Sequence, residues 1–104
     1  MTHLKSEDDV FKERFEPRML IADAQAQAAE LDWLPAALSN CGPGQWESCA
    51  YVHYVSGNAP NQRDSQWQFE KNIVINHKVF GMLVIDILRG DRIGGIEFVD
   101  RIEC

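Results

Sequence analysis

The chain of 104 residues lacks the short motifs that indicate a particular chemistry. It contains no Gly-x-Gly-x-x-Gly or Gly-x-x-x-x-Gly-Lys segment, so no nucleotide site is indicated. It also contains no Cys-x-x-Cys or His-x-x-x-His pair, and structural zinc sites normally include a closely spaced ligand pair of this kind. We therefore expect no cofactor, no metal and no enzymatic activity.

Cysteines and long apolar runs are also scarce. Three cysteines form an odd set that fits a closed disulfide framework poorly, so we expect reduced thiols. The longest strongly apolar run, residues 82–88, contains Asp86 and is too short to cross a bilayer. The first ten residues are polar and acidic, unlike a signal or transit peptide. These features predict a cytoplasmic protein that does not bind a membrane.

Basic residues are also scarce. The chain has 10 Lys and Arg against 16 Asp and Glu, a formal net charge of −6. No Lys or Arg lies between Met19 and Gln62, although Asp23, Glu30 and Asp32 do. An acidic surface disfavours direct contact with nucleic acid, because phosphate binding needs clustered cations. The charge favours a basic partner, and an ordinary solvated helix face is the alternative.

The composition that remains is that of one globular domain. Hydrophobic residues make up 45% and charged residues 25%, which is close to the average for soluble domains. We expect a single domain over residues 1–104, with residues 1–5 frayed. A helix is expected to begin at the capping residue Ser6 and to end before Pro17. A second helix is expected over 19–33, and a single helical turn over 36–38.

The second half of the sequence has the two-residue alternation of strands. A long loop over 57–65 separates the first strand from the second, and Gly90 is expected to supply a positive φ to a type II′ turn. Gly94 and Gly95 permit a bulge or a close backbone approach. The expected fold is α+β, with N-terminal helices packed on a four-stranded antiparallel meander sheet. The four strands are expected over 46–55, 66–76, 81–88 and 93–102.

The histidines offer the only candidates for acid–base chemistry. His53 and His77 fall on expected strands and are expected to face one another across a strand pair, with Tyr54 and Glu70 nearby. Such a pair would suit a small hydrolase or nuclease, although the acidic field opposes a polyanionic substrate. Asp86, inside an apolar strand, is expected to face solvent or to pair with an arginine.

Aromatic residues cluster around the segment without basic residues. Tryptophan and tyrosine are favoured as anchors of protein interfaces. Tyr51 and His53 alternate with Val52 and are expected on an exposed strand face, whereas Trp46 and Trp67 would fill the core on the plainer interpretation.

Three C-terminal segments, residues 67–70, 81–88 and 92–98, resemble in style the bacterial immunity proteins of contact-dependent inhibition and other polymorphic toxin systems. The resemblance implies a tight complex with a cognate toxin, often a basic nuclease domain. Immunity proteins diverge strongly, so the resemblance transfers no site residues to this chain.

The predicted function is therefore neutralisation of a basic toxin by occlusion of its active site. Acidic groups would steer the toxin and stand in for the phosphates it binds, while aromatic side chains would anchor the complex. A homodimeric interaction module joined through a strand edge is the first alternative, and the histidine-based hydrolase is the second. The predicted partner-binding residues are Asp23, Glu30, Asp32, Trp33, Glu47, Tyr51, Tyr54 and Asp64.

Overall fold

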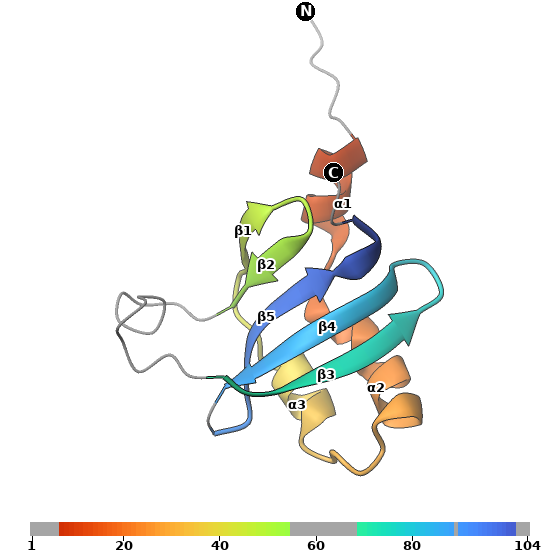
Figure 1. The fold of residues 1–104 in the computed structure, drawn as a ribbon, viewed down its shortest axis with the longest axis vertical. Coiled ribbons are helices and arrows are strands. Elements are labelled where there is room, and N and C mark those ends of the chain that lie inside the picture. The colour runs from red at the N-terminus through yellow and green to blue at the C-terminus, as the bar shows by residue number, and fades with distance from the viewer. Residues whose placement is uncertain (1–6, 55–68, 89, 102–104) are drawn as a thin grey trace, which may run out of the picture.

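The computed structural model describes residues 7–54, 69–88 and 90–101, and Figure 1 shows helices followed by a sheet. Asp64 and Trp67 lie outside the described residues. No helix in the described ranges is long and apolar enough to span a membrane. The elements are α1 (Glu7–Arg14), η1 (Pro17–Leu20), α2 (Ile21–Gln27), α3 (Leu34–Ser39), β1 (Gln45–Ser48), β2 (Tyr51–His53), β3 (Phe69–His77), β4 (Gly81–Leu88), β5 (Arg92–Phe98) and η2 (Val99–Arg101).

The helical half is more segmented than the sequence predicts. The expected helix over 19–33 is wrong at both ends, because Pro17 opens a 3₁₀ turn and the α-helix ends at Gln27. Ala28 leaves the helical region, with φ −137° and ψ 50°. The single turn expected over 36–38 is the longer helix α3, which carries Pro35 in its first turn, where a missing N–H costs no hydrogen bond.

The sheet has five strands rather than four and is only partly a meander. The expected strand over 46–55 folds back on itself, because a turn at Cys49 and Ala50 separates β1 from β2. The Ala50 N–H donates to Ser48 Oγ within this turn. β2 pairs with β5 instead of β3, so the antiparallel order is β1-β2-β5-β4-β3.

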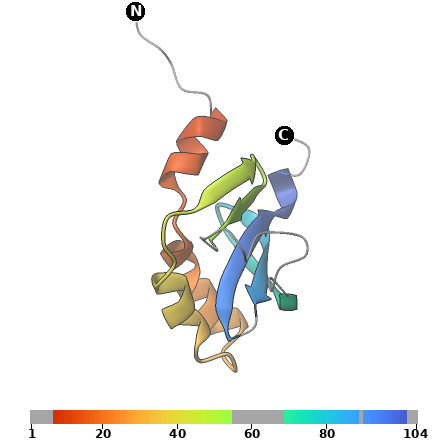
Figure 2. The ribbon, with the colours of Figure 1, turned by 90° about the vertical axis from the view of Figure 1, so that its left-hand side faces the viewer.

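The helices α1, α2 and α3 lie on one side of the sheet, as Figure 2 shows. The inward side chains of α2, α3 and the strands form one core, in which Leu20, Leu34 and Phe98 are fully buried. Trp46 is partly buried and packs against this core, in keeping with the plainer interpretation. Its ring lies 5.7 Å from Phe98 and 5.5 Å from Phe11, so aromatic contacts attach α1 to the sheet.

The turn between β4 and β5 requires two left-handed residues. Gly90 has φ 86°, which confirms the expected positive φ at this position. Asp91 also has a positive φ of 57°, so the turn does not have the type II′ pattern, in which only the first central residue is left-handed.

The cysteines are not all reduced. Cys49 is disulfide-bonded, which contradicts the expectation of reduced thiols, whereas Cys41 is a free thiol. Burial raises the pKa of the Cys41 thiol to about 11. Because disulfides persist mainly in oxidising compartments, the oxidation state of Cys49 in the cell is a direct test of the expected cytoplasmic location.

Candidate functional site

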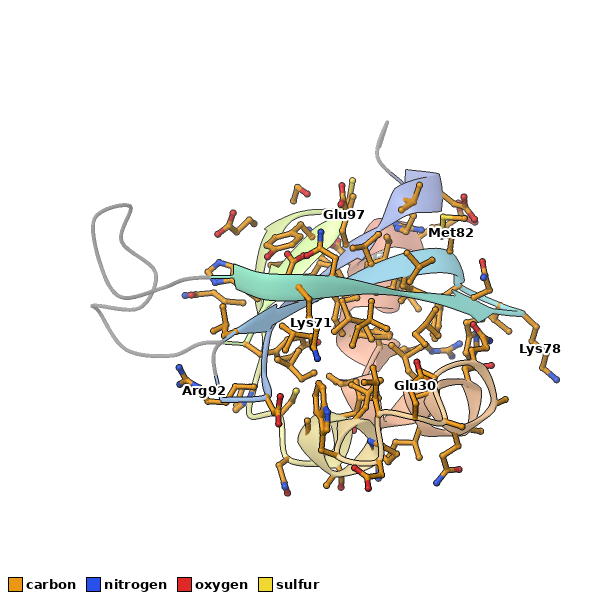
Figure 3. The ribbon with its side chains drawn as sticks, turned by 60° about the horizontal axis from the view of Figure 1, so that its bottom comes forward. Glu30, Lys71, Lys78, Met82, Arg92 and Glu97 are labelled. Carbon is orange, nitrogen blue, oxygen red and sulfur yellow. The ribbon has the colours of Figure 1, made fainter. Side chains whose placement is uncertain are left out.

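The side of the sheet that faces away from the helices carries the candidate site. Its side chains form rows across the strands, since His53 pairs with Gly95, Gly95 with Asp86, and Asp86 with Asn72. Figure 3 shows Glu97 and Met82 on this side and Glu30 on the helix side. We call this surface the open face. It consists of Tyr51, His53, Asn72, Val74, Asn76, Met82, Val84, Asp86, Gly95 and Glu97, together with Glu47, which contacts His53.

The centre of the open face is a hydrogen bond between Tyr51 on β2 and Asp86 on β4. The Tyr51 hydroxyl donates to Asp86 Oδ2 at 3.0 Å and crosses the intervening strand β5 at Gly95. A Cβ at Gly95 would lie only 2.1 Å from the Tyr51 hydroxyl oxygen. The close approach expected at Gly95 is thereby confirmed, and it is what lets the ring lie across β5. In its satisfied orientation the Asn72 amide donates to Asp86 Oδ1 at 2.9 Å.

The electrostatics of this pair favour a neutral tyrosine and penalise the carboxylate. Burial raises the pKa of Asp86, the hydrogen bond from Tyr51 lowers it, and the nearby Glu97 carboxylate raises it, with a net upward shift. Burial and the Asp86 charge also raise the pKa of Tyr51 well above its usual range. The hydroxyl therefore stays protonated and donates to Asp86. The burial of the Asp86 carboxylate makes its charged form less favourable than it would be in water.

A second acidic contact lies beside the first. Glu47 on β1 forms an ion pair with His53 Nε2, and the His53 ring stacks beside Tyr51 at 6.1 Å between ring centroids. Although it belongs to the open face, His53 is only 7% exposed, so the expectation of an exposed histidine is wrong. Its Nδ1 is buried and makes no hydrogen bond to any described residue.

Apolar side chains complete the open face on β3 and β4. Val74 is 51% exposed and Met82 is 40% exposed, and Val84 lies between Val74 and Glu97 in the same cross-strand row. The two described rows that pass through Glu97 and Asp86 contain no Lys or Arg, and Lys71 and Arg92 occur at other register positions of the sheet. A half-buried tyrosine, exposed aliphatic groups and the carboxylates of Asp86 and Glu97, which have no Lys or Arg beside them in the described rows, would together complement a basic protein surface.

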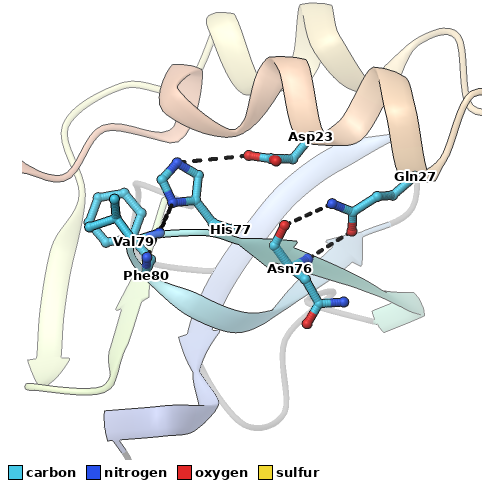
Figure 4. Close-up of polar contacts among 6 residues, drawn as sticks. All are labelled: Asp23, Gln27, Asn76, His77, Val79 and Phe80. Atoms are coloured by element: carbon cyan, nitrogen blue, oxygen red, sulfur yellow. Dashed lines mark hydrogen bonds and ion pairs between the residues drawn. The ribbon is translucent and has the colours of Figure 1, made fainter.

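The structure separates the two histidines that the hydrolase alternative requires. His77 belongs to the helix side, where its Nε2 lies 3.8 Å from Asp23 Oδ2 (Figure 4). Its Nδ1 accepts hydrogen bonds from the backbone N–H groups of Val79 and Phe80 at 3.0 and 3.2 Å. His53 lies on the opposite face of the sheet, so the expectation that His53 and His77 face one another is wrong.

The remaining predicted residues do not share one surface with Tyr51. Glu30 and Asp32 are exposed on the helix side, between α2 and α3. Trp33 is half-buried beneath Lys71, whose ammonium lies 5.2 Å from the ring centroid. Lys71 lies on the edge strand β3, beside the register shift between Phe69 and Lys71.

Tyr54 packs against the core instead of joining the open face. With Cys41 it lines two shallow pockets of about 340 and 430 Å³. Burial raises the pKa of Tyr54 above its usual range. Of the predicted residues that the structure describes, only Glu47 and Tyr51 lie on the open face.

Asn72 and Glu97 were not among the predicted site residues, and the contacts expected for Asp86 were wrong. The structure gives Asp86 the Tyr51 hydroxyl as a donor, in place of the expected solvent or arginine. Two features of the sequence could have indicated this contact. One is an acidic residue inside an apolar strand, and the other is a neighbouring strand that contains two glycines. Only the strand order reveals that Tyr51 can reach it.

Within the described residues, no group of three His, Cys, Asp or Glu side chains is placed to hold a metal ion. No family model matches the sequence, and neither a curated protein nor a solved structure is significantly similar to the chain.

Proposed function

We propose that this chain is a binding protein that neutralises a basic protein toxin, and that the open face is its binding surface. This is the role of an immunity protein in a contact-dependent inhibition or related toxin system, with a nuclease domain as the partner. The proposal keeps the predicted function but moves its surface from α2 to the sheet.

The observation that carries the proposal is the position of Asp86. Its carboxylate is half-buried in a central strand, and its net raised pKa shows that the surroundings disfavour the charge. An uncharged residue would stabilise the strand better, so the charge at this position supports a partner that supplies a cationic group. Tyr51 fixes the carboxylate, and Glu97 adds a second charge in the next row.

Inhibition follows from covering the toxin's active site. A nuclease binds phosphates with Lys and Arg side chains, and the carboxylates of Glu47, Asp86 and Glu97 offer the same charge to those groups. The apolar groups Val74 and Met82 would be desolvated around the charged contacts, which strengthens them. The complex then excludes the nucleic acid from the site without chemistry by this chain.

The test compares two double variants that each remove two negative charges. In Asp86→Asn/Glu97→Gln the charges come from the open face, and in Glu30→Gln/Asp32→Asn they come from the helix side. The probes are the basic proteins encoded by the genes next to this one, with binding measured by calorimetry and inhibition measured in a nuclease assay. We expect the first variant to bind at least about tenfold more weakly, since ~1.4 kcal/mol corresponds to a factor of ten.

The helix-side variant is the matched control and should bind like the native chain. Equal effects of the two variants would mean that only net charge matters, and a larger effect of the helix-side variant would place the interface on α2. A neighbouring basic domain that does not bind the native chain at all would contradict the toxin-neutralising function.

A further inference from the structure

The outer edge of β3 is closed at one position by a side chain from α2. The Gln27 amide donates from Nε2 to the Asn76 carbonyl oxygen at 2.7 Å, and Gln27 Oε1 accepts from the Asn76 N–H at 2.8 Å. Figure 4 shows both bonds. A side-chain amide that both donates to and accepts from one residue reproduces the contacts that an added antiparallel strand would make.

The register of β3 fixes which other backbone groups face outward. Asn76 turns both its backbone groups toward Gln27, so its pair with Met82 is a non-hydrogen-bonded pair. Hydrogen-bonded and non-hydrogen-bonded pairs alternate along an antiparallel ladder, and the ladder is regular from Lys71 to His77. The backbone groups of Asn72 and Val74 therefore also face away from β4.

We propose that the edge of β3 is a pairing surface for a second copy of this chain, and that Gln27 keeps it closed. Two copies related by a twofold axis at Val74 would place Val74 opposite Val74, and Asn72 opposite Asn76 on either side. This register is self-complementary, gives three hydrogen-bonded pairs and sets no like charges opposite one another. Val74, 51% exposed, would pack against its copy.

Gln27 removes both outer pairs of this register, because the Asn76 groups are already bonded in each copy. The central pair alone does not hold two folded chains together, since exposed strand edges associate through runs of unpaired groups. The native chain is accordingly monomeric through this edge. The inference does not rest on the proposed function, although Val74 belongs both to the edge of β3 and to the open face.

The test measures mass in solution by light scattering coupled to size exclusion. The native chain should have a mass near 11.9 kDa, whereas Gln27→Ala should rise toward twice that value as concentration increases. Gln25→Ala, an exposed change on the same helix, is the matched control and should remain monomeric. Gln27→Ala combined with Val74→Lys should return to the monomer mass, because two lysines would then face each other at the axis.

A native dimer through β3, or a folded Gln27→Ala chain that stays monomeric at every concentration, would overturn the inference. If Gln27→Ala does not fold, hydrogen exchange in the native chain tests whether Gln27 closes the edge of β3. The Asn76 amide should exchange slowly and the Val74 amide quickly, although both face outward from the same strand. Equally fast exchange at the two amides would show that Gln27 does not close the edge.

Discussion

Replacing Gly95 with alanine should break the hydrogen bond at the centre of the open face. An added Cβ would lie 2.1 Å from the Tyr51 hydroxyl oxygen and 2.5 Å from Cζ, well inside van der Waals contact. The ring must move by about an ångström or more to reach an ordinary contact distance. The 3.0 Å bond from Tyr51 to Asp86 cannot survive that displacement.

The magnitude follows from two opposing effects. Losing a hydrogen bond to a charged group costs about 1.5–3 kcal/mol, with the lower end appropriate for a half-buried carboxylate. Alanine recovers ~0.5–1 kcal/mol relative to glycine within a strand. The free energy of unfolding of Gly95→Ala should thus fall by about 0.5–1 kcal/mol, which corresponds to roughly 2–8 °C in Tm for a domain of this size.

Urea and thermal unfolding measure this loss, and two further variants show its origin. Gly42→Ala meets nothing within 4 Å and should be neutral. In a Tyr51→Ala background the clash is absent, so adding Gly95→Ala should cost nothing. The reasoning is refuted if Gly95→Ala is as stable as the native chain, or if its cost is the same without Tyr51.

Three further outcomes are expected. Asp86→Asn should have a higher urea midpoint than the native chain at pH 7, with the difference shrinking as the pH falls toward 4, because the raised pKa of Asp86 means that its charged form disfavours folding above that pKa; a lower midpoint at pH 7 would contradict this sign. With its pKa near 11, Cys41 should react with iodoacetamide at pH 8 about 100-fold more slowly than an exposed thiol, as peptide mapping of native and urea-unfolded protein would show. His77→Ala removes the acceptor of two backbone N–H groups and should lower the free energy of unfolding by about 1–3 kcal/mol, whereas Val79→Ala, at a 71% exposed side chain, should change it by less than ~0.5 kcal/mol.

Local patterns in the sequence predicted the faces of the strands well. Val52 is buried and Tyr51 lies on the opposite face, and Ile73 and Ile75 point into the core, because strand alternation depends only on neighbouring residues. The α+β class and the position of the β4–β5 turn followed from the same kind of signal.

The site depended on contacts that no local pattern contains. Tyr51 and Asp86 are 35 residues apart, and they meet only because β5 lies between β2 and β4. The acidic segment was assigned to one surface, but position along the chain does not encode which side of a sheet a residue faces. Asp23 lies beside His77 on the helix side of the sheet, whereas Glu47 contacts His53 on the open face.

The most direct test of the central claim is the ratio of dissociation constants of the two charge-matched double variants for the neighbouring basic toxin domain. We predict that Asp86→Asn/Glu97→Gln binds at least about tenfold more weakly than Glu30→Gln/Asp32→Asn, which should match the native chain. A ratio near one, or a weaker complex for the helix-side variant, would contradict the assignment of the open face as the binding surface.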